Sequence, residues 1–178
     1  MEFLDVLDKE GNYTGQIEER GKIHKLNIPH WEVVILLVNN KGQTLLQKRS
    51  KDKVFYPNYW GVCSGHVDAG EELIHAALRE LEEELGIKCN PEDLHILEEK
   101  ELNIIDINSN VRRFYYTYCD KKEDEFTIQE SELTEVKWYD IDELINIVKN
   151  HENGYTMNDN TIYLLERLKN CIKNKYIK

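Results

Sequence analysis

The chain has 178 residues and a formal net charge of -11, from 34 acidic and 23 basic side chains. Its length favours one domain with its own core, and a hydrophobic fraction of 40% excludes a disordered chain. The negative charge argues against a nucleic-acid-binding surface, and the longest apolar run, residues 33–38, is too short to span a bilayer. We expect a cytoplasmic protein, because the first residues lack a signal-peptide pattern and the four cysteines are widely spaced.

Strands and helices are predicted throughout the chain. Apolar alternation between turn residues predicts strands at residues 3–7, 13–17, 32–38, 44–48, 94–103, 112–119 and 136–139. Amphipathic periodicity predicts helices at residues 72–85, 140–150 and 160–174, the first of them ending at Gly86. Residues 50–71, interrupted by proline and glycine, are predicted to form a loop. The first two strands form a hairpin, and the mixture indicates an α/β or α+β fold.

Three carboxylates share one face of the predicted helix 72–85. With Glu80 set at zero, Glu83 lies at about -60° and Glu84 at about +40° around the helix axis. Like charges at this spacing destabilise a helix by about 0.2–0.5 kcal/mol per pair, and the helix dipole disfavours them near the C-terminus. A hard divalent cation, Mg²⁺ or Mn²⁺, would relieve the repulsion and could join the carboxylates to phosphates. For the glutamate run alone, the alternative is a solvated charged face.

The residues around these carboxylates form a longer pattern. Gly65 is followed after five residues by Glu71, and after seven more by Arg79-Glu80-Leu81; Glu83-Glu84 and Gly86-Ile87 complete it. The string resembles the Nudix box, G-x5-E-x7-R-E-U-x-E-E-x-G-U with U a bulky apolar residue, at every specified position. The resemblance implies an enzyme that hydrolyses a nucleoside diphosphate linked to another group. It also implies an α/β/α sandwich, in which a mixed sheet lies between helices and the box forms a loop-helix-loop.

The resemblance implies a role for each residue of the box. Glu80, Glu83 and Glu84 are implied ligands of Mg²⁺ or Mn²⁺, with the Gly65 carbonyl as a further ligand. Glu71 and Arg79 are the implied supports that fix the loop and orient the carboxylates.

The general base is less certain from the sequence. Glu83 or Glu84 could serve within the box. In some Nudix enzymes the base comes from a later loop, and here the acidic stretch 130–135 precedes the last predicted strand. Glu132 is the candidate in that stretch, and a solvated acidic loop is the alternative.

Outside the box, about the first 90 residues are similar to the isopentenyl-diphosphate isomerase branch of the superfamily. The similar positions include residues 5–8, 11, 14–15, 24, 30, 47–50, 56–57, 60 and 63–66. In those isomerases three histidines and two glutamates bind a metal, and a cysteine acts on the alkene. His24, His30 and His66 match the histidines, which implies a second metal site. The alternative is three ordinary hydrogen-bonded histidines.

The chain departs from the isomerase pattern at the positions of the two glutamates and the cysteine. The glutamate pair would fall near Val111 and Arg113, and the cysteine at Ser64, one position after Cys63. The complete box, which the isomerases have lost in part, favours a hydrolase with an isomerase-like N-terminal extension. The alternatives are an isomerase and a non-catalytic module that binds a nucleotide.

Substrate recognition is weakly encoded in the sequence. Arg49 and Arg113 could neutralise phosphates and Tyr56 could stack on a base, although packing is the simpler role for the aromatic ring. We expect a small phosphorylated, nucleotide-like substrate, with no nucleic acid and no membrane as partner; homodimers are frequent in the family. One domain over residues 1–178 is expected, with a hairpin extension at about 1–28, a Nudix core at about 29–150 and a C-terminal helix at about 160–174.

Overall fold

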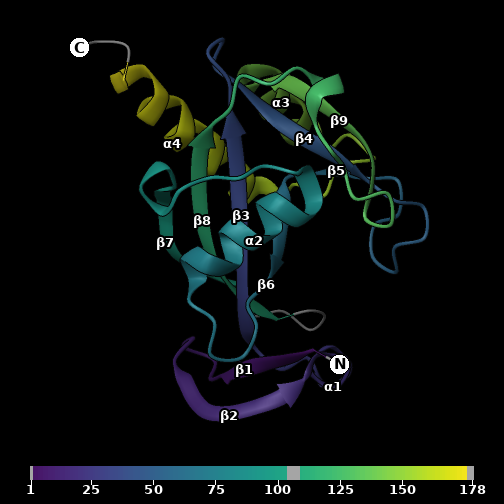
Figure 1. Cartoon of the computed structure of the whole chain (residues 1–178), viewed down its shortest axis with the longest axis vertical. Coiled ribbons are helices and arrows are strands. Elements are labelled where there is room, and N and C mark those ends of the chain that lie inside the picture. Colours follow the sequence, from purple (N-terminus) through teal and green to yellow (C-terminus); the bar gives the residue numbers. More distant parts are fainter. Residues whose placement is uncertain (1, 104–108, 176–178) are drawn as a thin grey trace.

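The computed structural model describes residues 2–103 and 109–175, and its main feature is a seven-stranded sheet (Figure 1). The strands are β1 (Phe3–Leu7), β2 (Tyr13–Glu19), β3 (His30–Val38), β4 (Gln43–Arg49), β5 (Trp60–Gly61), β6 (Cys63–His66), β7 (His95–Asn103), β8 (Asn110–Tyr118) and β9 (Leu133–Asp140). The helices are α1 (Arg20–Leu26), α2 (Leu73–Leu85), α3 (Ile141–Lys149) and α4 (Asp159–Lys175), with short 3-10 turns η1 (Pro91–Asp93) and η2 (Glu123–Glu125).

Strand β3 is the centre of the sheet. The strand order is β5-β4-β3-β8-β7, with β6 also paired to β3 and β9 also paired to β4. Strands β3 and β8 run parallel, and the other pairs are antiparallel, so the sheet is mixed. All of β3 is buried except Glu32, which is half-buried; a nearly continuous apolar strand of this kind is expected where helices cover both faces of a sheet.

The side chains of β3 divide between two hydrophobic layers. Val33 and Ile35 pack with residues of α2, whereas Val34 and Leu36 pack with residues of α3 and α4. Helix α2 therefore covers one face of the sheet, and α3 and α4 cover the other (Figure 1). The α/β/α sandwich predicted from the sequence is confirmed.

The hairpin formed by β1 and β2 lies at the end of the molecule where β3 begins (Figure 1). It contacts the loop that precedes α2 through hydrogen bonds donated by two backbone N–H groups. The Ala69 N–H donates to the Phe3 carbonyl at 2.8 Å, and the Gly70 N–H donates to the Asp5 carboxylate at 2.9 Å. The hairpin thus holds the first part of the box in place.

Two parts of the sequence prediction are wrong. Residues 50–71 contain strands β5 and β6, where a continuous loop is predicted, and the unpredicted helix α1 follows β2. Strand β6 is rich in small residues and has no apolar alternation; its order comes from pairing with β3, from Glu32↔His66 to Ile35↔Cys63. Helix α1 is only 7 residues long and contains Gly21, so local propensity gives it little signal.

The other predicted elements are present, and β1 has the predicted bounds whereas most of the others differ by a few residues at one or both ends. Strand β9 is longer than predicted, because it pairs with β4 along most of its length. Helix α2 ends as predicted at Gly86, which adopts φ of 64° and donates its N–H to the Glu82 carbonyl. Within residues 2–103 and 109–175, no helix is both long and apolar enough to cross a membrane.

Candidate active site

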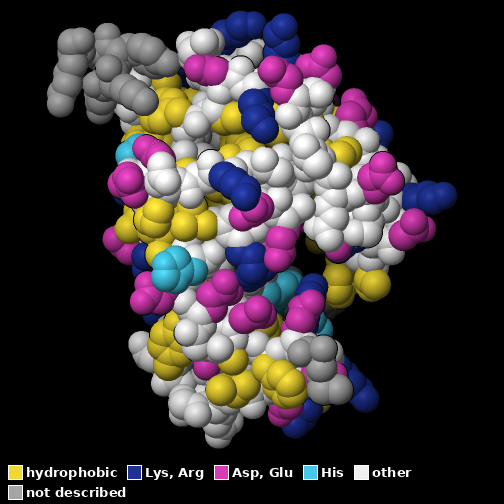
Figure 2. Space-filling model, in the orientation of Figure 1, with side chains coloured by type: hydrophobic (Ala, Val, Ile, Leu, Met, Phe, Trp, Pro, Cys, Tyr) yellow, Lys and Arg dark blue, Asp and Glu magenta, His cyan; other side chains and the backbone are white. Residues whose placement is uncertain are grey.

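Helix α2 buries one side against the sheet and presents its carboxylates on the adjacent side. Ala76, Ala77, Leu81 and Leu85 form the buried side. The three carboxylates are not equivalent. The side chain of Glu83 is 53% exposed, that of Glu80 is 13% exposed, and Glu84 retains only 7% of its surface. The helix therefore presents a graded acidic face that runs from the solvent into the protein. Acidic side chains are also gathered on the surface of the molecule that carries α2 (Figure 2).

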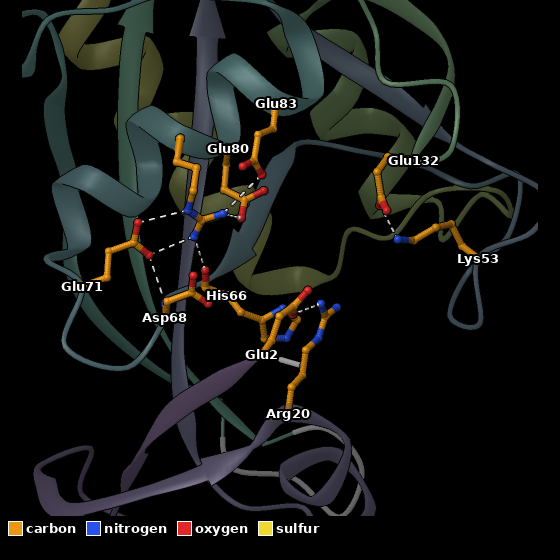
Figure 3. Close-up of polar contacts among 10 residues, drawn as sticks. Glu2, Arg20, Lys53, His66, Asp68, Glu71, Glu80, Glu83 and Glu132 are labelled. Atoms are coloured by element: carbon orange, nitrogen blue, oxygen red, sulfur yellow. Dashed lines mark hydrogen bonds and ion pairs between the residues drawn. The ribbon is translucent and has the colours of Figure 1, made fainter.

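Arg79 connects the acidic helix to the loop before it. Its guanidinium donates to both carboxylate oxygens of Glu71, from Nε at 3.0 Å and from Nη2 at 2.9 Å. Nη2 also donates to the His66 carbonyl at 2.9 Å. Nη1 donates to Glu80 at 2.6 Å and to Glu83 at 3.4 Å (Figure 3). One guanidinium thus fixes the loop and two of the helix carboxylates, which is the kind of planar, multiple contact that arginine makes better than lysine.

The electrostatics of Glu71 agree with this arrangement. Burial would raise the pKa of Glu71, but hydrogen bonds from Arg79 and from the Asp68 N–H hold it below its ordinary value. Glu71 is therefore a carboxylate whose charge is neutralised by one fixed partner.

Gly65 lies directly against the carboxylate of Glu80. A Cβ atom built on Gly65 would stand 2.0 Å from both Cδ and Oε1 of Glu80. No side chain fits between the β6 backbone and this carboxylate, so the approach requires glycine. The backbone of β6 and the Glu80 carboxylate are consequently in contact.

Glu80 and Glu84 lie in surroundings that disfavour two negative charges. Burial and then the charge of Glu84 raise the pKa of Glu80 to about 7, although Arg79 opposes this. Burial also raises the pKa of Glu84, and hydrogen bonds from Gln47 and Cys63 oppose it. Carboxylates that repel one another in a desolvated place are what a divalent cation would stabilise. The available ligands are the carboxylate oxygens of Glu80 and Glu84 next to the Gly65 backbone. Oxygen ligands of this kind fit Mg²⁺ or Mn²⁺.

The predicted base Glu132 comes from the segment before β9, whereas Glu80 and Glu83 come from α2 (Figure 3). The segment before β9 is anchored on the box, because the Gln129 N–H donates to the Glu84 carbonyl at 3.1 Å. Glu132 itself forms an ion pair with Lys53, and its charge raises the pKa of Glu84. The structure therefore brings Glu132 to the box, and its role as a base stays a prediction.

The three predicted substrate contacts do not converge. Arg49, at the end of β4, donates to the Phe55 carbonyl at 3.0 Å, and its charge lowers the pKa of Glu84. Tyr56 follows in the same loop and is 59% exposed. Arg113 lies on β8, two strands away from β4, and pairs at 3.0 Å with Glu99 on the outer strand β7. Arg49 thus lies near the box and Tyr56 lies in the loop that Arg49 contacts, whereas Arg113 is engaged elsewhere.

The three predicted metal-binding histidines converge from separate elements. His24 comes from α1, His30 from β3 and His66 from β6, and one ring nitrogen of each lies within 4.8 Å of the others. Burial and then the positive charge of Arg20 lower the pKa of His66 well below its ordinary value, so its imidazole is neutral. A neutral imidazole is the form that binds a metal.

Two residues of these sites were not predicted. Gln47 of β4 donates from Nε2 to Glu84 at 2.7 Å, and Glu32 of β3 lies opposite His66 and accepts from Arg112 at 2.7 Å. A sequence signal exists for both. Glu32 interrupts an apolar strand, and Gln47 follows Leu45 on the face of β4 that points toward α2.

Comparison with known proteins agrees with the geometry. The NUDIX domain family model matches residues 28–159. Nudix hydrolase 3 of Arabidopsis thaliana is 34% identical over 168 residues, which are 89% of this chain and 22% of that protein. A Nudix hydrolase of Clostridium acetobutylicum is 33% identical over 86% of this chain and 77% of its own length. Isopentenyl-diphosphate Delta-isomerase 2 of Photorhabdus laumondii is 30% identical over 88% of this chain and 87% of its own length.

The chain spans about half the length of several other relatives that it matches. Among solved structures, DR0079 of Deinococcus radiodurans has a TM-score of 0.73 at 19% identity, covering 94% of this chain and 99% of its own. The NUDIX domain of Shewanella oneidensis NrtR, crystallised with ADP-ribose, has a TM-score of 0.59 at 18% identity, covering 80% and 87%. Together with the complete box, these matches show that the chain belongs to the Nudix hydrolase family, in which some of its relatives are isomerases.

Proposed function

We propose that the protein is a divalent-metal-dependent hydrolase that cleaves the pyrophosphate bond of a nucleoside diphosphate linked to another group. The observation that carries the proposal is the graded acidic face of α2, where Glu80, Glu83 and Glu84 lie beside the Gly65 backbone. The same residues would hold Mg²⁺ or Mn²⁺, with the Gly65 carbonyl as a further ligand. The bound cation would supply charge stabilisation at the phosphate oxygens and a lowered pKa for water.

The remaining steps, which are positioning of the carboxylates and proton removal from water, are assigned to residues of the protein. Arg79 and Glu71 hold the loop and the helix together, so that Glu80 and Glu83 keep one orientation. In this proposal Glu132 accepts the proton of the attacking water, because its segment is anchored on Glu84 and its charge raises the pKa of Glu84. If Glu132 is released from its ion pair with Lys53, both of its carboxylate oxygens can accept a proton. Attack on phosphorus then needs positioning and electrostatic stabilisation rather than covalent chemistry.

The proposed substrate is nucleotide-like. The negatively charged phosphates of the substrate are expected beside Arg49. Tyr56 is exposed in the loop that Arg49 contacts, and its ring could stack on the base. A structural relative binds ADP-ribose, which is a nucleoside diphosphate linked to a sugar. We also propose a cytoplasmic location, which the four free thiols support.

A substrate-cleavage assay tests this function. The native protein, with Mg²⁺ or Mn²⁺, is incubated with a panel of ADP-ribose, dinucleoside polyphosphates, sugar nucleotides, nucleoside triphosphates and isopentenyl diphosphate, and the products are separated by chromatography. We expect cleavage of at least one nucleotide at a phosphoanhydride bond, and loss of that cleavage on adding EDTA. If the protein instead binds a nucleotide without turnover, it is a non-catalytic module. Conversion of isopentenyl diphosphate to its isomer would favour an isomerase.

A second metal site is proposed at His24, His30 and His66, on the observation that their nitrogens converge. The isomerase glutamates have no counterpart, since Val111 is buried and Arg113 pairs with Glu99. We therefore propose a three-histidine site for a borderline cation such as Zn²⁺, without isomerase chemistry.

Metal analysis of one double variant tests the histidine site. The variant His24→Ala/His66→Ala is expected to lose about one equivalent of bound Zn²⁺ relative to the native protein, measured by mass spectrometry after equilibrium dialysis. His75→Ala, on α2, is the control and is expected to retain that equivalent. If the double variant has native metal content and native activity, the histidines are structural only.

A further inference from the structure

We propose that Gln47 is a positioning residue of the reaction, which holds the buried carboxylate of Glu84 in the orientation needed to bind the cation. This inference rests on the proposed function. It assigns a task to a residue that lies outside the box.

The hydrogen bond between the two side chains has only one chemical arrangement. Gln47 Nε2 stands 2.7 Å from Glu84 Oε2, and the two residues are 4% and 7% exposed. An ionised carboxylate can only accept hydrogen bonds, so the amide nitrogen must face Glu84. The other amide atom, Oε1, is therefore directed away from the carboxylate.

Gln47 lies on β4 and is held in the sheet by the strands on its two sides. In the sheet, Gln47 is opposite Gly61 of β5 and Val136 of β9. The residue two positions earlier on the same face, Leu45, is part of the apolar core. The amide is thus presented to the helix by a rigid central strand rather than by a loop.

The hydrogen-bonded pair of Gln47 and Glu84 leaves one polar atom buried without a partner, which packing alone does not explain. Oε1 of Gln47 is buried and has no hydrogen-bond partner among residues 2–103 and 109–175. A buried acceptor without a partner destabilises the folded state. Apolar side chains at both positions 47 and 84 would avoid this cost and the burial of a carboxylate. The retained pair therefore points to a requirement for the Glu84 carboxylate itself.

The carboxylate of Glu84 has a second hydrogen-bond donor besides Gln47. The thiol of Cys63, on β6, is hydrogen-bonded to Glu84 and is 2% exposed. Two neutral donors from two strands fix the rotation of the carboxylate and leave its remaining lone pairs for a cation beside Glu80. Loss of a partner that orients a metal ligand lowers metal affinity by about 10- to 100-fold.

The experiment measures Mn²⁺ binding directly, by electron paramagnetic resonance of the free ion, on the full chain. Gln47→Met has nearly the same length and no donor. We expect its Mn²⁺ affinity to fall about 10- to 100-fold, with a native circular dichroism spectrum. Thr44→Val is the matched control, because Thr44 is fully buried on the same strand and its hydroxyl also has no partner in the described part of the chain. It is expected to bind Mn²⁺ as the native protein does.

Three results would overturn the proposal. Mn²⁺ affinity of Gln47→Met within twofold of the native value would show that the amide is not needed. An equal loss in Thr44→Val would show a general effect of the core. Native protein that binds no Mn²⁺ would refute the proposed function together with this inference. If Gln47→Met does not fold, Gln47→Asn is measured instead; it keeps the amide but shortens its reach, and the same loss of affinity is expected.

Discussion

Replacing Glu83 with glutamine is expected to lower kcat about 1000-fold or more while the fold stays native. The carboxylate of Glu83 is the most exposed of the three, so its removal disturbs little packing. Its expected effect on the free energy of unfolding is within about 0.5 kcal/mol. The loss of rate follows because an amide oxygen is a much weaker ligand for Mg²⁺ than a carboxylate. Turnover of the substrate found in the panel, with thermal unfolding in parallel, measures both quantities.

The neighbouring glutamate provides a control for this variant. Glu82 lies one position earlier on α2, and its carboxylate pairs with Lys88 at 3.2 Å. Glu82→Gln removes the same charge from the same helix but from outside the acidic site, and is expected to retain kcat within twofold. Native turnover in Glu83→Gln, or equal losses in both variants, would remove Glu83 from the proposed cation site.

Replacing Gly65 with alanine is expected to abolish Mn²⁺ binding and to lower kcat at least about 100-fold. The added Cβ would overlap the Glu80 carboxylate, at 2.0 Å from its carbon, so the carboxylate must move away from β6 and from Arg79. Overpacking of this kind also destabilises a protein by about 1–3 kcal/mol. Mn²⁺ binding and chemical denaturation measure the two effects separately.

Gly21→Ala is the control for the added methyl group. A Cβ at Gly21 has nothing within 4 Å, and the residue lies inside helix α1, where alanine is preferred. We expect native Mn²⁺ binding and equal or higher stability in that variant. If Gly65→Ala binds Mn²⁺ normally, then the contact between Gly65 and Glu80 is not part of the cation site.

The sequence pattern predicted most of the strands and helices and the residues of the box, because both depend on local spacing. The α/β/α layers were predicted from the resemblance of the box to the Nudix family. The periodicity of α2 placed Glu80, Glu83 and Glu84 on one face, and Gly86 ended the helix where predicted. The same periodicity did not predict how deeply each carboxylate lies. Depth depends on strands β4 and β6, which are distant in the sequence and supply Gln47 and Cys63.

Other features could not be obtained from local patterns. The short strand β6 exists because it pairs with β3, and the three histidines meet because α1, the start of β3 and the end of β6 lie together. Arg113 shows the opposite case. Its charge suggested a phosphate contact, but its partner Glu99 on β7 lies away from the box. Residues outside the box are therefore assigned reliably only when their neighbours across the sheet are known.

The central claim is cation-dependent attack of water on phosphorus at the carboxylates of α2. It is tested most directly by phosphorus NMR of the cleaved substrate in water enriched with oxygen-18, with Mg²⁺ and the native protein. We predict that one phosphate product carries the heavy oxygen, and that this signal disappears with EDTA and in Glu83→Gln. Cleavage that continues without the cation, or a product whose phosphate lacks the label, would contradict the account.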